Sequence, residues 1–198
     1  MGVLRSAYNF VLDITETIVI ALAIFVVIYL FAVQPHEVKG DSMLPNFVSG
    51  EYLLTNKITY RFHEPQRGDV IVFKFPLAQQ FDYIKRIIAL PNDEIMLQDN
   101  QVTIYNSQHP NGLALKELYL KPGTIVSGRS FLPEGKRLKI PEGEYFVMGD
   151  NRERSSDSRE WGFVPRELII GRSWVRYWPT QALAFIPSQT YEENKKNP

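Results

Sequence analysis

A serine in an unusual turn is the first residue in this sequence that could do chemistry. Ser42 lies in the stretch 40–45, GDSMLP, between a glycine that permits unusual backbone dihedrals and a proline that stiffens the exit. Such a turn can hold the hydroxyl of Ser42 and its own N–H toward an incoming carbonyl group. A serine hydroxyl is a weak nucleophile until a base removes its proton, so Ser42 needs a partner elsewhere in the chain.

Lys85 is the strongest candidate for that base. It lies in the stretch 83–90, YIKRIIAL, where the alternation of a β-strand places Lys85 and Arg86 on opposite faces. One of the two cations must therefore point into an apolar layer or its margin. Burial lowers the pKa of a lysine, because a low-dielectric environment disfavours the charged form, whereas an arginine keeps its proton. The alternative is a lysine whose stem packs while its ammonium group reaches water.

Histidine is the more usual base for a serine nucleophile, and the chain has three histidines. His63 lies in a loop-like stretch, 62–65, FHEP, and His109 precedes a proline. His36 follows closely on a long apolar run. We interpret all three as surface residues rather than as the base.

A third polar stretch, 149–159, has the sequence GDNRERSSDSR and follows the apolar residues 145–148, YFVM. It is too dense in hydrogen-bonding side chains to be core packing. One interpretation is a solvated loop whose surface ion pairs contribute little to stability. The other is a polar wall that positions a neighbouring group.

The composition excludes several other kinds of site. The 198 residues contain no cysteine, which rules out disulfides, thiolate zinc sites and cysteine nucleophiles. The three histidines form no close pair, so we predict no metal centre. The formal net charge is zero, which gives no electrostatic footprint for nucleic acid.

Residues 14–33 form the one long apolar run, after a short polar lead at residues 1–13. No charge occurs from Ile18 to Val33, and a helix that crosses a bilayer needs roughly 20 mostly apolar residues. A cleaved secretory signal has a shorter apolar stretch of about 7–15 residues and a small-residue cleavage site. We therefore predict an uncleaved transmembrane signal anchor, with a buried helix of a soluble domain as the remaining alternative. Arg5 and Lys39 flank the run on its two sides, so the charges leave its orientation open.

After Pro35 the pattern changes to short apolar runs of period two, separated by Gly, Pro, Asn and Asp. The 12 glycines and 13 prolines are too many for a helical bundle of this length. We predict a mostly β fold, with an antiparallel β-sheet core at residues 35–92 and 143–180 and a smaller β-rich subdomain inserted at residues 93–142. Residues 188–198 are charged and poor in apolar side chains, which predicts a flexible tail.

Eight stretches have the composition and length of strands. Residues 113–120 favour either a short helix or irregular structure. Trp174, Tyr177 and Trp178 either pack in the core, which we favour, or touch the headgroup region of a membrane, where such side chains are common. The predicted strands are 51–56, 69–75, 83–90, 95–97, 101–105, 137–140, 145–148 and 168–177.

Taken together, these stretches resemble the type I signal peptidase (leader peptidase) family. The first matching motif is SMxP, from Ser42 to Pro45, after a membrane anchor. GDVIVF at residues 68–73 and YIKRIIALP at residues 83–91 follow in order. GDNR at residues 149–152 closes the series, with Ser155, DSR at residues 157–159 and Gly162 behind it. One motif alone would be weak, but four in this order are highly specific.

The resemblance implies a serine–lysine dyad in which Ser42 is the nucleophile and Lys85 the general base, without a metal or cofactor. Ser155 would hydrogen-bond the lysine amine, and Asp157 and Arg159 would form a supporting ion pair. The backbone N–H of Ser42 would donate to the oxyanion. The family's β-rich catalytic core, with a smaller β region inserted between the lysine and the GDN segment, agrees with the turn-rich stretch that the pattern predicts.

Three positions depart from the common pattern of the family. Gly40 stands where some members carry a serine or threonine whose hydroxyl aids the oxyanion site, so that second donor would be absent here or supplied otherwise. Asn46 replaces a threonine that often follows the proline. Asn92 stands in a turn where glycine is usual, and asparagine tolerates a left-handed backbone better than most residues.

The resemblance implies a membrane-bound serine endopeptidase that removes N-terminal signal peptides from exported pre-proteins at Ala-x-Ala-like sites through an acyl-enzyme. Its partners would be those pre-proteins and the lipid bilayer, and not nucleic acid. It would lie in the cytoplasmic membrane with its catalytic domain on the extracytoplasmic side, or alternatively in a plastid thylakoid membrane. Two other functions stay open: a self-cleaving serine–lysine protease of the repressor type, and an inactive membrane-anchored binding module.

Overall fold

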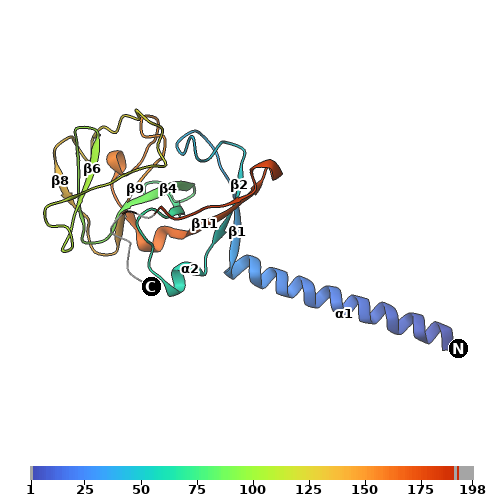
Figure 1. Ribbon diagram of the computed structural model, residues 1–198. Helices are drawn as coiled ribbons and strands as arrows, with labels where there is room; N and C mark the ends of the chain where they lie inside the picture. Colours follow the sequence, from blue (N-terminus) through green and yellow to red (C-terminus); the bar gives the residue numbers. More distant parts are fainter. Residues whose placement is uncertain (1, 190, 192–198) are drawn as a thin grey trace.

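A β-rich body built on two antiparallel sheets carries one long helix, α1 (Gly2–Phe31), that projects away from it (Figure 1). The computed structural model describes residues 2–189 and 191. The predicted fold class, mostly antiparallel β-sheet preceded by an N-terminal apolar helix, is confirmed.

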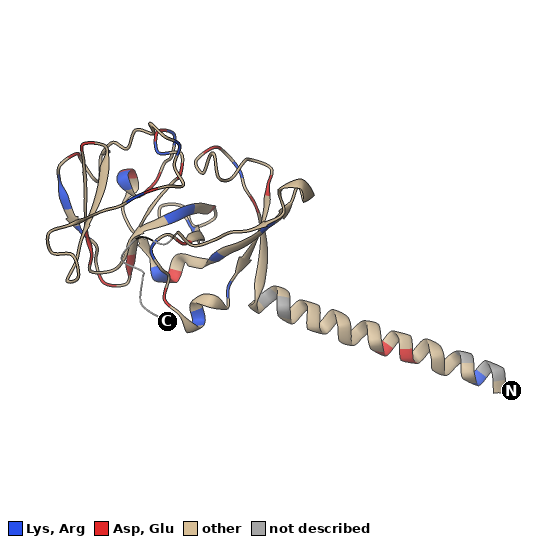
Figure 2. Ribbon diagram, viewed as in Figure 1, with Lys and Arg blue, Asp and Glu red and all other residues tan. Residues whose placement is uncertain are grey.

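Helix α1 contacts the β body at its C-terminal end, where the Arg61 guanidinium lies 5.7 Å from the centroid of the Phe31 ring. Its segment Tyr8–Val27 has a mean hydropathy of 2.4 with none of that window buried, and it is long and apolar enough to cross a membrane. Figure 2 shows few charged residues along it. The helix includes the lead predicted at residues 1–13 from Gly2 onward, and it ends at Phe31 rather than at residue 33. It ends early because Pro35 disfavours helical backbone before it, and Val33 instead begins a strand.

The larger sheet has eight strands in the order β1-β2-β11-β3-β4-β9-β10, with β12 paired to β11. Strand β4, which carries Lys85, lies between β3 and β9. β9 pairs with β4 only from Arg86 onward, which leaves the residues before it with one free edge. The strands are β1 (Val33–Glu37), β2 (Tyr52–Asn56), β3 (Val70–Lys74), β4 (Asp82–Ala89), β9 (Glu144–Met148), β10 (Val164–Pro165), β11 (Ile169–Trp178) and β12 (Ala184–Phe185).

The smaller sheet has four strands in the order β7-β6-β5-β8. All of them lie between residues 94 and 139, within the stretch that we predicted to be an inserted subdomain. Buried side chains of this sheet, such as Ile95 and Ile104, share one core with Ile88 and Phe146 of the larger sheet. The smaller sheet is therefore packed directly onto the larger sheet. The strands are β5 (Glu94–Gln98), β6 (Gln101–Tyr105), β7 (Leu113–Ala114) and β8 (Arg137–Lys139).

Each of the eight predicted strands is present, with its ends displaced by no more than one residue. β1, β7, β10 and β12 were not predicted, because three are two residues long and β1 contains a proline. In the ambiguous stretch 113–120, only Leu113–Ala114 forms regular structure. The remaining elements are the short helices α2 (Thr59–Phe62), α3 (Ser158–Trp161), η1 (Arg166–Leu168) and η2 (Thr180–Ala182).

The flexible tail predicted from residue 188 needs correction. The Ser188 hydroxyl donates to the carboxylate of Asp69, and Tyr191 is buried in the core with its hydroxyl 3.1 Å from that of Tyr119. An aromatic side chain and two hydrogen bonds outweigh the charged composition of the neighbouring residues. The rest of the predicted tail, residues 192–198, lies outside the described part of the chain.

Two tryptophans that we expected in the core are instead on the surface. Trp174 and Trp178 are 41% and 52% exposed, and Leu183 and Phe185 beside them are 66% and 73% exposed. These four side chains, here called the β11–β12 patch, lie on or next to β11 and β12, which pair with each other in the larger sheet. The Trp174 and Phe185 rings contact each other with centroids 5.9 Å apart.

Candidate active site

Ser42 occupies a turn that is anchored by its buried neighbours. Met43 and Phe47 are 0% and 3% exposed and pack into a small apolar core of the larger sheet. The Phe47 N–H donates to the Met43 carbonyl oxygen over 3.0 Å, which closes the turn. Gly40, at its entry, has a φ of +84°, in the left-handed region that favours glycine. The turn therefore holds Ser42 by packing on both sides and leaves its hydroxyl facing a cavity.

Lys85 reaches Ser42 from strand β4. Its Nζ lies 2.7 Å from Ser42 Oγ and 2.9 Å from the carbonyl oxygen of Ile84. Lys85 is 3% exposed, and burial lowers its pKa from 10.5 to about 8, against the opposing charges of Asp157 and Asp150. A lysine with this pKa is partly neutral near neutral pH, so it can accept the proton of the serine hydroxyl.

The neighbouring cation, Arg86, is buried as well, so both cations of β4 are withdrawn from water. Its guanidinium forms a bidentate pair with Asp150 at 2.9 and 2.7 Å. It also lies over the ring of Tyr119, 4.0 Å from the centroid. Lys85 has no carboxylate within ion-pair distance among the described residues. This difference in partners leaves Lys85 as the cation that can lose its proton.

The polar stretch 149–159 packs against the serine turn, which favours a polar wall over a solvated loop. The Asn151 N–H donates to the Ser42 carbonyl oxygen over 3.0 Å, and the Asn151 side-chain amide donates to the Asp41 carbonyl oxygen over 2.9 Å. Gly149 fits so tightly that a Cβ there would lie 2.3 Å from the Ser42 carbonyl oxygen and 2.2 Å from Ser155 Oγ. The wall therefore contacts the backbone of the candidate nucleophile directly.

Asp157 and Arg159 form the ion pair that the resemblance implied, at 2.9 Å with both side chains fully buried. Burial alone would raise the pKa of Asp157, but the hydrogen bonds and charge of Arg159 outweigh it and the pKa is lowered. Asp157 also accepts a hydrogen bond from the Gly149 N–H over 3.1 Å, which ties the pair to the wall. Ser155 Oγ is buried, and Lys85 Nζ bonds Ser42 and the Ile84 carbonyl oxygen instead, so the expected bond between Ser155 and Lys85 is not formed in this arrangement.

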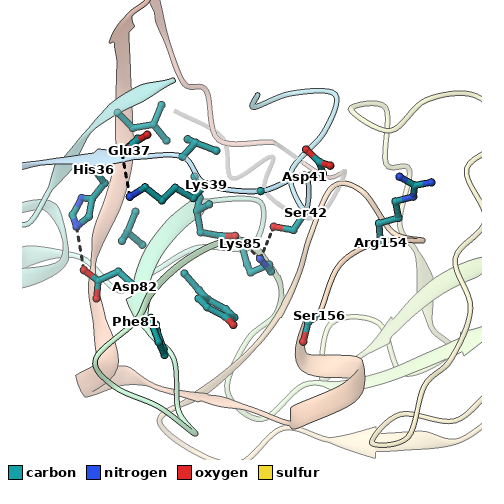
Figure 3. Close-up of a pocket in the computed structure, with 16 residues that line it drawn as sticks. His36, Glu37, Lys39, Asp41, Ser42, Phe81, Asp82, Lys85, Arg154 and Ser156 are labelled. Atoms are coloured by element: carbon teal, nitrogen blue, oxygen red, sulfur yellow. Dashed lines mark hydrogen bonds and ion pairs between the residues drawn. The ribbon is translucent and has the colours of Figure 1, made fainter. Parts of the chain in front are cut away.

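A cavity of about 410 Å³ opens beside Ser42 and Lys85 (Figure 3). β1 and the turn that follows it form one wall, and the start of β4 forms the other. Arg154 and Ser156 line the end near Ser42, while His36 and Asp82 line the opposite end (Figure 3). Since one wall is a free strand edge with unpaired backbone groups, the cavity suits an extended peptide.

Of the three histidines, only His36 lines this cavity. Its Nδ1 lies 2.9 Å from Thr55 Oγ1 and its Nε2 lies 3.6 Å from Asp82 Oδ2, so it is not the simple surface residue that we predicted. Burial lowers the pKa of His36. His63 follows α2 and is exposed. Among the described residues no group of three His, Cys, Asp or Glu side chains could hold a metal ion.

Several contacts that hold the wall were not identified from the sequence. Asn46, noted there only as a departure from a family pattern, donates from Nδ2 to Asp150 Oδ2 over 2.8 Å. Arg152 pairs with Glu117 of the inserted subdomain at 2.5 Å. No local motif indicates these pairings, because the two partners of each pair lie far apart in the sequence.

Comparisons with known proteins agree with the motifs. The family described as signal peptidase, peptidase S26, matches residues 11–178. The chain is 33% identical to a probable signal peptidase I-1 of Synechocystis sp., over 93% of this chain and 94% of that protein. It is 36% identical to a signal peptidase I of Leptolyngbya laminosa, over 89% of this chain and 84% of that protein. A crystal structure of a signal peptidase I from Enterococcus faecalis V583 aligns at 30% identity with a TM-score of 0.43, over 56% of this chain and 97% of that chain.

Proposed function

The chain belongs to the signal peptidase family, peptidase S26, and we propose that Ser42 and Lys85 are the catalytic pair with which it removes signal peptides. Members of this family are serine hydrolases, so a nucleophilic serine is required. The observation that carries the assignment is the distance of 2.7 Å between Ser42 Oγ and the Nζ of a buried lysine, at the edge of the cavity.

The first half of the reaction transfers the signal peptide to Ser42. Neutral Lys85 Nζ accepts the hydroxyl proton while Ser42 Oγ attacks the carbonyl carbon of the scissile bond. The Lys85 ammonium group then gives that proton to the amide nitrogen as the C–N bond breaks. The mature protein leaves with a free amino terminus, and the signal peptide stays on Ser42 as an ester.

The second half releases the signal peptide. Lys85, neutral again, takes a proton from a water molecule whose oxygen attacks the ester carbon. The C–Oγ bond breaks, Ser42 Oγ recovers the proton from Lys85, and the signal peptide departs with a carboxyl terminus. One lysine serves both halves because each half returns it to the neutral form.

The oxyanion of each tetrahedral intermediate needs a hydrogen-bond donor. The backbone N–H of Ser42 is our candidate, because it donates to no other group among the described residues. Gly40 has no side-chain donor to add. Ser155, Asp157 and Arg159 are supporting residues in this proposal: the buried ion pair stiffens the wall, and Ser155 Oγ is available to the lysine amine when substrate enters.

We assign as substrates pre-proteins whose cleavage sites are of the Ala-x-Ala type. The family and α1 indicate a membrane-anchored protein. We place α1 in the cytoplasmic membrane, with the β body on the extracytoplasmic side and the β11–β12 patch at the headgroups, where tryptophan is favoured. A shared membrane restricts the search between enzyme and substrate and orients the cut site.

The test is cleavage of a pre-protein with an Ala-x-Ala site by the full-length protein in detergent. Ser42→Ala and Lys85→Ala are each expected to abolish cleavage while the fold, followed by circular dichroism, stays intact. Lys139→Ala, an exposed lysine of the inserted subdomain, is the matched control and keeps full activity. Normal activity in either dyad variant contradicts the assignment, and loss of activity in His63→Ala would indicate a histidine base.

A further inference from the structure

A short segment of the inserted subdomain, residues 117–119, reaches into the larger sheet behind the serine turn. The Glu117 carboxylate accepts hydrogen bonds from both terminal nitrogens of Arg152, over 2.6 and 2.5 Å. The two side chains are 7% and 0% exposed, so the pair is almost completely withdrawn from water. A buried guanidinium without its carboxylate is strongly unfavourable, and Arg152 therefore holds its position only while Glu117 is present.

Tyr119 completes this contact. Its hydroxyl donates to Glu117 over 2.6 Å and accepts from Arg152 over 2.9 Å. Its ring lies under the guanidinium of Arg86. Its backbone carbonyl oxygen accepts a hydrogen bond from Asn46 Nδ2 over 3.0 Å. One residue of the insertion thus touches the wall, strand β4 and the serine turn.

Two series of hydrogen bonds connect this segment to Ser42. Arg152 Nε donates to the Gly149 carbonyl oxygen over 3.0 Å, and in the same loop the Asn151 N–H holds the Ser42 carbonyl oxygen. The other series passes through Asn46, which follows the serine turn and donates hydrogen bonds to both Tyr119 and Asp150. Neither Glu117 nor Tyr119 lines the cavity.

We propose that Glu117 and Tyr119 are positioning residues of the reaction: the inserted subdomain holds the wall, and through it keeps Ser42 within reach of Lys85. This inference rests on the proposed function of Ser42 and Lys85. Because the two residues act through the backbone of Ser42 and not on substrate, their loss lowers kcat and leaves KM unchanged. The insertion is then part of the catalytic apparatus and not an appended unit.

The experiment compares Glu117→Gln and Tyr119→Phe with the parent enzyme, full-length and in detergent, on the Ala-x-Ala pre-protein. Glu117→Gln leaves Arg152 without a counter-charge, and a displacement of Ser42 on the order of 1 Å lowers kcat about 100-fold. Tyr119→Phe keeps the ring under Arg86 and removes the hydroxyl, so we expect a smaller loss of kcat. The matched control is Glu94→Gln, which breaks the pair with Arg137 inside the smaller sheet, at 3.4 Å, and leaves kcat unchanged.

All variants are assayed well below their melting temperatures, so that every enzyme is folded. A reduced kcat with unchanged KM in Glu117→Gln, absent in Glu94→Gln, supports the inference. An unchanged kcat, a raised KM, or a loss that only follows the unfolded fraction overturns it. The parent enzyme and Ser42→Ala are assayed first. If the parent does not cleave the pre-protein, or if Ser42→Ala does, that result contradicts the proposed function and not the role of Glu117 and Tyr119.

Discussion

Lys85 and Arg86 are adjacent residues that burial affects in opposite ways. Arg86 meets Asp150 in a bidentate pair and stays charged, whereas Lys85 meets a serine hydroxyl and a backbone carbonyl group. Desolvation therefore acts on Lys85 with little compensation, and its pKa falls to about 8. The chemistry of the site depends on this difference: Asp150 pairs with Arg86 on one face of β4, and no carboxylate of the described residues pairs with Lys85 on the other face.

We expect kcat/KM for a pre-protein to rise with pH and to level off above about pH 8, since only the neutral form of Lys85 accepts the serine proton. Cleavage rates measured from about pH 5 to about pH 10 check this. Lys139→Ala should give the same profile as the parent. An acid limb centred at about pH 6.5 would instead indicate a histidine and contradict the dyad.

Lys85→Met is expected to be inactive and yet more stable than the parent near neutral pH. In the parent the pKa of Lys85 falls from 10.5 to about 8 on folding, so the charged form costs about 3 kcal/mol of stability below pH 8. Between about pH 8 and pH 10.5 only the unfolded chain holds this proton, so the parent gains stability as the pH rises and the difference narrows. Urea unfolding at both ends of this pH interval measures the difference in free energy of unfolding between Lys85→Met and the parent. A difference that does not change with pH would contradict a lowered pKa of Lys85.

At the scale of elements, the serine turn and the wall meet backbone to backbone. Gly149 lies where any side chain would strike the Ser42 carbonyl oxygen, and that oxygen accepts the Asn151 N–H. The backbone atoms at this contact cannot rotate aside as the end of a flexible side chain could. The two elements can therefore shift only together, and a shift of Ser42 would carry it away from Lys85.

Gly149→Ala tests this fit. The added Cβ would lie 2.3 Å from a backbone oxygen of Ser42, so we expect kcat/KM to fall by about 100-fold or more, with a lower Tm. Gly123→Ala is the matched control: its φ of +81° makes alanine strained by about 1–2 kcal/mol, but no atom lies within 4 Å. Equal losses of activity in the two variants would contradict a specific role for Gly149.

The elements that could be predicted are those whose own sequence determines them. Alternating apolar residues predicted the eight strands, and the spacing of Ser42 and Lys85 within motifs predicted the candidate pair. The contacts of Arg152 with Glu117 and of Asn46 with Asp150 join residues 35 and 104 positions apart, and nothing local to either partner indicates the other. Trp174 and Trp178 were misassigned to the core because composition does not show which face of β11 is covered.

At the scale of the whole molecule, the anchor and the β body are nearly independent. Among the described residues, none of the apolar window Tyr8–Val27 of α1 is buried, and no helix residue belongs to the three apolar cores. The β11–β12 patch provides a second apolar surface on the body itself. The side of the membrane on which the β body lies therefore depends on the topology of α1 and not on packing between the helix and the sheets.

The absence of cysteine makes this topology easy to test. Lys136→Cys places a thiol on an exposed turn of the body, and Gly2→Cys places one at the start of α1. A membrane-impermeant maleimide should label Lys136→Cys in intact cells, and Gly2→Cys only after permeabilisation. The reverse pattern would place the catalytic domain on the wrong side of the membrane for exported substrates.

The short connection between α1 and the sheet also has a consequence for which pre-proteins can be cut. The helix ends at Phe31, β1 begins at Val33, and Ser42 follows soon after, with no slack linker between them. An extended chain spans at most about 3.6 Å per residue, so Ser42 stays within about 40 Å of the end of the anchor. Ser42 is therefore confined to a limited distance from the end of the anchor. We expect that a pre-protein whose cleavage site lies too close to its own apolar segment, or too far from it, cannot present the scissile bond to Ser42. Such a pre-protein would not be cleaved even with the right side chains at its cleavage site.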